Sequence, residues 1–376
     1  MVGTKDREHR MIRSAAAEFA DRELAPLREE FDAFPFGPFF QPVLEKAFEL
    51  DFFHLTLPED LGGAGMGIQA LCIVLEEISR QDASLGGVIF TNAFAQELLL
   101  SSDRSFALQG IVEGADVVND FLIAFPVFNN PSEIRTMVRV HEENENCILS
   151  GKLEYLVIGG IARWAIIPAA DENSQGYSFY IADLKDAGIM KSEPVLSLGL
   201  RSCFAVDVEF KNLEAIPICQ IGKGDDCFKK SVDKMQLAAA AISEGIMKGS
   251  FMEALSYSKE RDQGGRKIID WSELQMMLAE MAVEIRIAEM IISKACQAAQ
   301  RKEKGWEQYA SAAAIHVQNA AVSATTDGVQ ALGGVGYMKD FGQEKRFRDA
   351  QHMQAALGLA PLKKIKLLKR MIGKEV

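Results

Sequence analysis

The spacing of apolar residues divides the chain into three stretches, and the first of them is helical. From about residue 10 to residue 120, apolar side chains recur every three or four positions, as at Ile12, Ala16 and Phe19. That period is typical of amphipathic helices. Three prolines between residues 35 and 42 and a glycine cluster at 62–67 interrupt the pattern and separate one helix from the next. We therefore predict an N-terminal helical domain over residues 1–120.

The second stretch has the period of β-strands. Apolar and polar residues alternate in short runs, as where Val206, Val208 and Phe210 are separated by Asp207 and Glu209, which is the pattern of half-buried strands. Clusters of Asn, Pro and Gly between the runs supply turns. We predict an antiparallel, barrel-like β domain over residues 121–224.

Helical spacing returns after residue 224 and continues to the end of the chain. One apolar stripe is formed by Leu274, Met277, Leu278, Met281, Ile285 and Ala288. A methionine-rich stripe of this kind is usually part of a core rather than of a cofactor site, and we expect the same here. The prediction is a C-terminal four-helix bundle over residues 225–376. Helices, then strands, then helices make an α+β chain that is mainly α, without the βαβ alternation of a dinucleotide-binding fold.

Composition and charge exclude several classes of function. The 376 residues include 41 Lys and Arg against 53 Asp and Glu, a net charge of −12, which disfavours nucleic acid and anionic membranes as partners. No run approaches the roughly 20 apolar residues of a membrane span, and charges interrupt the N-terminal segment, so we expect a cytoplasmic protein. Six scattered cysteines without a CxxC pair and five dispersed histidines give no support for a metal site.

Six short segments, taken in order, resemble the acyl-CoA dehydrogenase family over essentially the whole chain. They are LPEDLGG at 57–63, LEEISRQDAS at 75–84, RDQGGRKI at 261–268, LAEMA at 278–282, QALGGVGY at 330–337 and RDA at 348–350. In the C-terminal part, the third segment resembles the family's R-x-x-F-G-(R/K)-x-I and the fourth its L-A-D-M-A. The order of helices, strands and helices is also similar to that family's three-domain architecture.

The resemblance implies a composite FAD site. Family members bind FAD across a subunit interface, usually within a tetramer, so that one subunit's β domain holds the flavin ring and its neighbour's C-terminal helices hold the ADP half. By this resemblance Arg261 would face the pyrophosphate, a role suited to an always charged guanidinium fork. Gln330 would supply a polar contact, and Gly333 and Gly334 would let the cofactor approach the backbone closely.

The flavin half departs from the family pattern. Where the family usually has T-E-P-G-A-G-S-D, residues 124–133 read AFPVFNNPSE, and where it has W-I-T-N-G, residues 155–159 read YLVIG. Ala124 and Val157 therefore replace two hydroxyl groups that would bond the flavin ring, and neither can donate a hydrogen bond. On the ADP side, Gly264 replaces the phenylalanine of the R-x-x-F-G motif.

The catalytic base is missing as well. Dehydrogenation of an acyl thioester requires a carboxylate that takes the α-proton. The glutamate that most members carry after R-D-A corresponds to Leu357, and the earlier position that a minority use corresponds to Met235. Neither side chain can accept a proton, so we assign no catalytic residue.

Three functions remain open at this point. The first is a base-less subunit of a heteromeric acyl-CoA, or acyl-carrier thioester, dehydrogenase, which contributes the ADP half of a shared FAD site. Its partners would be a homologous subunit, the thioester substrate and an electron-transfer flavoprotein or similar acceptor. The second is a complete FAD-dependent dehydrogenase with a displaced base, for which Glu244 is the candidate. The third is a non-enzymatic scaffold that binds acyl groups or CoA. We favour the first.

Overall fold

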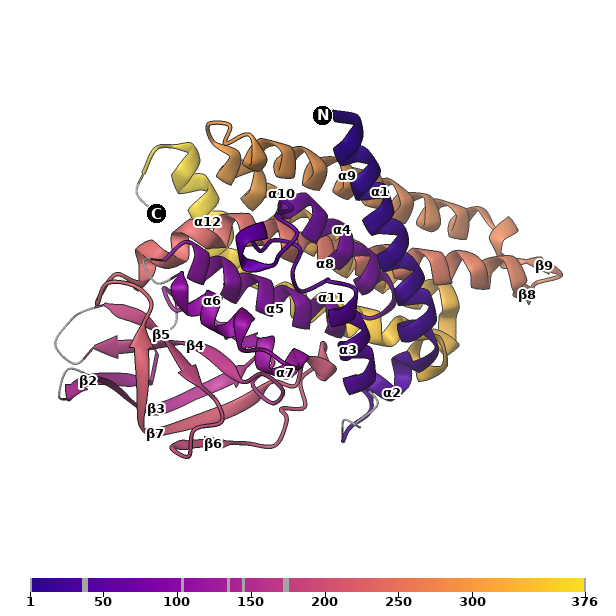
Figure 1. Cartoon of the computed structure of the whole chain (residues 1–376). Coiled ribbons are helices and arrows are strands. Elements are labelled where there is room, and N and C mark those ends of the chain that lie inside the picture. The colour runs from indigo at the N-terminus through magenta and orange to yellow at the C-terminus, as the bar shows by residue number, and fades with distance from the viewer. Residues whose placement is uncertain are drawn as a thin grey trace.

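The N-terminal part of the chain is a layer of helices (Figure 1). The computed structural model describes residues 2–35, 40–102, 105–133, 136–143, 146–171 and 176–374. Its N-terminal helices are α1 (Val2–Phe19), α2 (Arg28–Asp32), α3 (Phe40–Glu49), α4 (Ile68–Gln81), α5 (Ala83–Leu100), α6 (Phe106–Glu113) and α7 (Val118–Phe121). The glycine-rich segment 62–67 forms the connection that precedes α4, as the spacing of the sequence predicts.

Helix α5 is the central helix of this layer. Asp82 caps its N-terminus, where the carboxylate accepts a hydrogen bond from the Ser84 N–H at 2.7 Å, as a good N-cap residue does. It is the one described helix that is long and apolar enough to cross a membrane, but 89% of that stretch is buried inside the protein. A helix that is apolar on all sides and surrounded by protein is a core helix. The cytoplasmic location stays a prediction.

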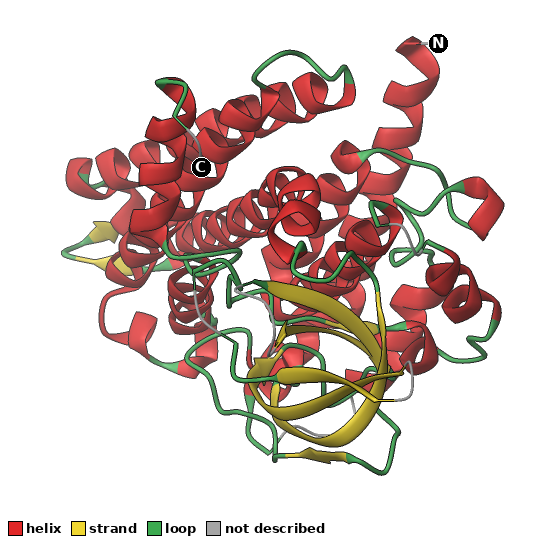
Figure 2. Ribbon diagram, turned by 90° about the vertical axis from the view of Figure 1, so that its left-hand side faces the viewer, coloured by secondary structure: helices red, strands yellow, loops and turns green. Residues whose placement is uncertain are grey.

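The β strands close into a small barrel (Figure 2). They are β1 (Ile123–Ala124), β2 (Arg139–Glu143), β3 (Asn146–Leu156), β4 (Trp164–Asp171), β5 (Tyr177–Asp183), β6 (Ile189–Lys191) and β7 (Val206–Pro217). The order β4-β2-β3-β7-β5 returns to β4 because β4 also pairs with β5. Most pairs are antiparallel as predicted, but β1–β4 and β2–β4 are parallel, so the sheet is mixed. Closure leaves few exposed edges.

The C-terminal part consists of long helices. They are α8 (Gly224–Glu260), α9 (Ser272–Gln300), α10 (Trp306–Leu332), α11 (Gln343–Met353) and α12 (Ala360–Met371). A run of buried alanines at 238–241 lies in the middle of α8, and α4 and α10 both pack on this helix. Small side chains let neighbouring helices approach closely. The segment between α8 and α9 is a short hairpin of β8 (Asp262–Gln263) and β9 (Arg266–Lys267), which projects from the end of the molecule (Figure 1).

The RDA segment on α11 connects all three parts of the chain. The Arg348 guanidinium bonds the Asp32 carboxylate of the N-terminal layer at 2.6 Å, while the Asp349 carboxylate accepts the Leu200 N–H at 2.7 Å. Lys345 pairs with Asp349 at 2.7 Å in a fully enclosed setting. Buried charges that are paired in this way fix the relative position of the elements that carry them. The segment therefore orients α11 and the residues that follow it.

Candidate functional site

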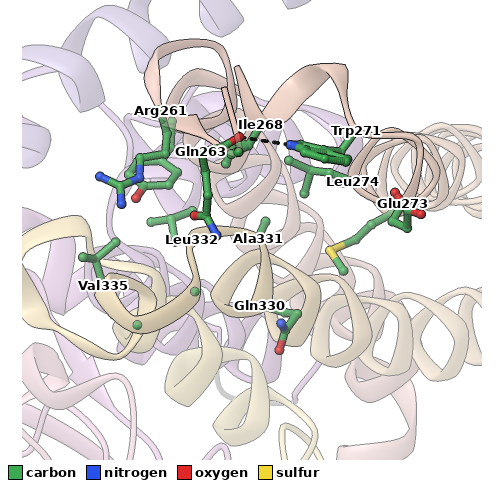
Figure 3. A pocket seen from close by; sticks show the side chains of 15 residues that line it. Arg261, Gln263, Ile268, Trp271, Glu273, Leu274, Gln330, Ala331, Leu332 and Val335 are labelled. Carbon is green, nitrogen blue, oxygen red and sulfur yellow. Dashed lines mark hydrogen bonds between the residues drawn. The ribbon is translucent and has the colours of Figure 1, made fainter. Parts of the chain in front are cut away.

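A cavity of about 810 Å³ lies where the end of α8, the β8–β9 hairpin, the first turns of α9 and the end of α10 meet (Figure 3). All four residues that the sequence assigns to the ADP half of an FAD site line it: Arg261, Gln330, Gly333 and Gly334. The first is about 70 residues from the other three in the sequence, and the fold brings them around one space. The volume is within the roughly 300–1,000 Å³ of ordinary ligand pockets.

Arg261 is the C-cap residue that follows α8, and its backbone is held in place. Its N–H donates to the Tyr257 carbonyl at 2.9 Å, and its own carbonyl accepts the Ile268 N–H at 2.9 Å. Among the described residues, none forms a hydrogen bond or ion pair with the guanidinium, which is exposed. The backbone is thus fixed while the charged group stays available to a ligand.

Two glycines at the end of α10, Gly333 and Gly334, line the cavity with backbone and no side chain. Gly333 has φ +63° and ψ −137°, a conformation that is essentially open only to glycine. A Cβ added to Gly334 would have no heavy atom of the chain within 4 Å. The space in front of this backbone therefore belongs to the cavity, and a ligand can approach the main chain there.

Trp271 is a lining residue that the sequence analysis did not identify. Its indole Nε1–H donates to the Gln263 carbonyl at 3.3 Å (Figure 3), and the Arg266 guanidinium stacks on its ring at 3.6 Å. Gly264, which replaces the family's phenylalanine, has φ +66°, and a Cβ there would come within 2.9 Å of the Trp271 ring. An aromatic ring from the next segment therefore stands beside the position that lost one. In the sequence, this residue could have been singled out as a tryptophan shortly after the RDQGGRKI motif.

The apolar stripe of α9 is only partly a core stripe. Leu278, Met281 and Ile285 are buried as predicted, but Leu274 and Met277 line the cavity. Leu274 and Met277 also pack against the core, so the first turn of the stripe serves both the core and the cavity. These two side chains add apolar surface to a cavity that polar side chains also line.

The positions expected to contact the flavin ring lie in the core. Ala124 and Val157 are both fully buried, and Ala124 is the last residue of β1, which pairs with β4. The next residue, Phe125, forms a bridge with Val157. Both expected positions are therefore occupied by apolar side chains inside the protein.

The position of the usual base is tied directly to the β domain. Leu357 is 3% exposed. Its N–H donates to the Val127 carbonyl at 2.8 Å, and its carbonyl accepts the Asn130 amide at 3.3 Å. Two residues later, the Leu359 N–H donates to the Glu133 carboxylate at 2.8 Å. Met235, the other base position, is 1% exposed in α8. Neither position presents an acceptor for a proton.

Aromatic side chains fill the space beside this segment. The rings of Phe128 and His352 lie 4.4 Å apart between centroids, and the Tyr155 hydroxyl is 3.3 Å from the His352 Nε2. Burial lowers the pKa of His352 below its ordinary value because the charged imidazolium loses its hydration. The β domain and α11 are thereby packed against each other by a neutral aromatic cluster.

Glu244, the candidate for a displaced base, belongs to a different cavity. It lines a space of about 300 Å³ together with Glu76, Glu289 and the thiols of Cys72 and Cys296. Burial, with the neighbouring Glu76 carboxylate, raises the pKa of Glu244 to about 7. Leu357 and Met235 are not among the residues that line this space.

An ammonium group already stands among these carboxylates. Lys248 forms ion pairs with Glu76, with Glu244 at 2.8 Å and with Glu289 at 2.7 Å. The three carboxylates lie close enough together to hold a metal ion, but the lysine supplies their positive charge. No local pattern in the sequence indicates this cluster, because its members come from three separate helices, α4, α8 and α9.

Two family models match the chain. The acyl-CoA dehydrogenase N-terminal domain covers residues 6–102, and the acyl-CoA dehydrogenase C-terminal domain covers residues 222–371. The chain belongs to the acyl-CoA dehydrogenase family. The β domain lies between the two matched ranges.

Individual relatives agree along the length of the chain. The "Probable acyl-CoA dehydrogenase FadE25" of Mycobacterium tuberculosis is 27% identical over 376 residues, which cover 97% of this chain and 95% of the relative. The "Caffeyl-CoA reductase-Etf complex subunit CarC" of Acetobacterium woodii is 26% identical over 357 residues, 92% of this chain and 93% of that protein. The structure of butyryl-CoA dehydrogenase from Megasphaera elsdenii has a TM-score of 0.86 at 20% identity, with 97% of this chain and 98% of that chain covered. The last comparison supports the fold.

Within this acyl-CoA dehydrogenase fold, the two halves of the expected site differ. The ADP-side residues surround an open cavity, whereas Ala124, Val157 and both base positions are buried.

Proposed function

We propose that this chain is the base-less subunit of a heteromeric, flavin-dependent acyl-CoA or acyl-carrier thioester dehydrogenase, and that it contributes the ADP half of an FAD site shared with a homologous subunit. One observation carries the proposal: Arg261, Gln330, Gly333 and Gly334 surround a cavity of about 810 Å³, while the residues of the flavin half are buried.

The cavity residues fit the ADP half of FAD. The unpaired guanidinium of Arg261 matches a pyrophosphate, which it can bond through two parallel N–H groups. The Gln330 amide offers both a donor and an acceptor. The bare backbone at Gly334 would let the cofactor lie against the main chain.

The flavin half of the chain does not fit a flavin ring. Ala124 and Val157 lack the hydroxyl groups of the family pattern, and both are fully buried. The Leu357 segment is hydrogen-bonded to Val127 and Asn130. In the proposed complex, the flavin ring is therefore held by the β domain of the partner subunit.

The surface around the cavity supports a protein partner. Large apolar side chains within three residues of the lining residues Val335 and Met277 are exposed: Tyr337 at 76%, Met338 at 56% and Met276 at 64%. Exposed apolar groups beside a polar ligand cavity are typical of a protein interface. A homologous subunit seated there would cover these side chains and complete the FAD site.

Within such a complex, FAD supplies the hydride acceptor of the dehydrogenation. This chain would bind the pyrophosphate through Arg261 and exclude water from it, and a carboxylate of the partner would take the α-proton of the thioester. An electron-transfer flavoprotein, or a similar acceptor, would then reoxidise the complex. The A. woodii relative, named as a subunit of a caffeyl-CoA reductase-Etf complex, supports that choice of acceptor.

The test uses this chain together with a homologous subunit that has intact flavin motifs and a catalytic glutamate. Arg261→Ala should lower the flavin content of the assembled complex, because one charge-assisted contact is worth about 1.5–3 kcal/mol, roughly ten- to a hundredfold in affinity. Arg261→Lys should restore part of the loss, since a point charge replaces a bidentate fork. Flavin is measured by fluorescence after release, and assembly by size-exclusion chromatography.

Two further variants make the result specific. Gly334→Ala adds one methyl group to the open cavity without a clash inside the chain, so it should reduce flavin occupancy while leaving the chain folded. Arg286→Ala removes an exposed positive charge from α9 outside the cavity and should have no effect. Full flavin occupancy of an intact complex with Arg261→Ala would refute the shared ADP half.

Purified alone, the chain should be nearly colourless. About one tightly bound flavin per chain, seen in the absorption spectrum, would favour a complete enzyme with a displaced base. Assembly without any flavin in the complex would favour an acyl- or CoA-binding scaffold.

A further inference from the structure

A small cavity of about 210 Å³ lies beside Leu357, between the first turns of α8, the loop at 130–133, α10 and α12. Its volume is below the roughly 300–1,000 Å³ of ordinary ligand pockets, so an occupant would be small. The charged residues that line it are Lys229, Lys363, Lys366, Arg370, Glu133 and Asp225. Four cations face two carboxylates, although the whole chain has a net charge of −12.

The carboxylates near this cavity are already engaged. Glu133 pairs with Lys366 at 2.6 Å, and its other oxygen accepts the Leu359 N–H. Asp225 accepts a hydrogen bond from the Ser132 hydroxyl at 2.6 Å.

A third carboxylate, Asp233, is equally engaged. It pairs with Arg370 at 2.6 Å, and the same guanidinium donates to the Ser311 hydroxyl oxygen at 3.2 Å. Lys366 and Arg370 therefore each have a carboxylate partner.

Lys363 is the exception. Its side chain is buried, with 6% exposure, and its ammonium donates only to two neutral oxygens, Gln318 Oε1 and the Gln354 carbonyl, each at 3.1 Å. Within the described part of the chain, no carboxylate oxygen lies within 4.0 Å of it. Buried charges are normally paired because an isolated charge loses its hydration at a high cost. An ammonium has three donors, and the third is left for a ligand.

A second donor faces the same space. The buried Ser311 hydroxyl accepts from Arg370, and its own hydrogen goes to no other described acceptor. A hydroxyl that accepts one bond can donate another. The cavity thus presents an uncompensated ammonium and a hydroxyl donor in a site too small and too polar for an acyl chain.

We propose that this cavity binds a small oxyanion, a carboxylate or a phosphate group, whose oxygens accept hydrogen bonds from Lys363 and Ser311. The anion would supply the negative charge that no described carboxylate provides to Lys363. The site stands where most family members carry a negatively charged base, and it does not depend on flavin or on a partner subunit.

The test titrates the full chain with two probes, inorganic phosphate and acetate, against a sodium chloride control of equal ionic strength. Binding is measured by isothermal titration calorimetry and by the shift in the thermal unfolding midpoint. The two probes separate phosphate recognition from carboxylate recognition. We expect one of them to bind wild type, and Lys363→Gln to weaken that binding at least tenfold.

The controls keep the result interpretable. Lys364→Gln removes an exposed charge next in sequence and should leave the affinity within twofold of wild type. Leu357→Glu places a carboxylate in the same cavity, so it should also weaken anion binding at least tenfold by occupying the site. Circular dichroism verifies that each variant is folded. The proposal is overturned if neither probe binds beyond the chloride control, or if Lys363→Gln and Leu357→Glu bind the anion as wild type does.

Discussion

Lys363→Met should make the protein more stable at neutral pH and change how its stability depends on pH. Burial, which strips the ammonium of water, lowers the pKa of Lys363 to about 8, and nearby Lys366 acts in the same direction against Glu133. An unfolded lysine has a pKa of about 10.4. The difference of about 2.4 units corresponds to about 3 kcal/mol, at about 1.36 kcal/mol per unit.

The number of protons bound in each state decides whether the free energy of unfolding rises or falls with pH. Below pH 8 the lysine is protonated in both states, so the folded protein bears the full cost of the buried charge. Between about pH 8 and pH 10.4 the unfolded chain binds more protons than the folded one. The free energy of unfolding therefore rises with pH across this window, by up to roughly 3 kcal/mol from this one group. The methionine variant lacks this rise.

The net gain at pH 7 is smaller than the full cost. Methionine leaves the Gln318 and Gln354 oxygens without the lysine donor, at about 1 kcal/mol each, so Lys363→Met should gain about 1–2 kcal/mol. The other charged groups around the ammonium are present in both proteins, and the effects of Glu133 and Lys366 on it are already included in its lowered pKa. These groups are Glu133, Asp225, Lys229, Asp233, Lys366 and Arg370.

The assay is chemical denaturation of wild type, Lys363→Met and Lys364→Met at pH 7 and pH 10. Wild type and the exposed-site control should change in parallel, whereas the advantage of Lys363→Met at pH 7 should disappear or reverse at pH 10. Equal pH dependence in all three proteins would refute the reasoning, because Lys363 would then hold its proton as a solvated lysine does.

Three further predictions concern the two halves of the site. Leu357→Glu in the isolated chain should give no dehydrogenase turnover with an artificial electron acceptor, since the flavin contacts are absent too and such groups act as a unit; measurable turnover would show that only the base was missing. Glu133→Gln should lower the free energy of unfolding by about 1–2 kcal/mol, because it breaks the pair with the partly exposed Lys366; an unchanged denaturation midpoint would contradict this. Gly333→Ala should cost about 1–3 kcal/mol through its backbone conformation, whereas Gly334→Ala should leave denaturation unchanged, and equal effects of the two would contradict the assigned geometry.

Periodicity was sufficient to predict the order of the elements. The three-residue and four-residue spacing predicts helices at both ends, and the alternation at Val206, Val208 and Phe210 predicts β7. The sequence pattern does not predict whether two paired strands run parallel or antiparallel. An alternating pattern says which face of a strand is buried, but not which strand lies beside it, so the parallel pairs of β4 with β1 and β2 could not be foreseen. The boundaries 1–120, 121–224 and 225–376 stay predictions.

The residues of the candidate site could be predicted where they belong to a sequence motif. Arg261, Gln330 and the two glycines came from the order of motifs, and they line one cavity; their role in binding FAD stays a prediction. The properties of Lys363 were not accessible in the same way. Its burial and its lack of a carboxylate depend on which side chains α8 and α10 bring to α12, and nothing in the local sequence distinguishes it from Lys364.

The losses on the flavin side and the retained features on the ADP side differ in physical character. A site that had merely decayed would leave voids and unpaired polar groups, which are costly in a close-packed interior. On the flavin side, the Leu357 segment is instead hydrogen-bonded to Val127 and Asn130. That half is packed within the chain, except for the cavity of about 210 Å³ beside Leu357. The ADP side keeps an open volume of about 810 Å³ and an unpaired guanidinium on Arg261, features that reduce packing and do nothing for the stability of the isolated chain. They are explained if a ligand and a second subunit complete this face, which is why the flavin content of the assembled complex is the decisive measurement.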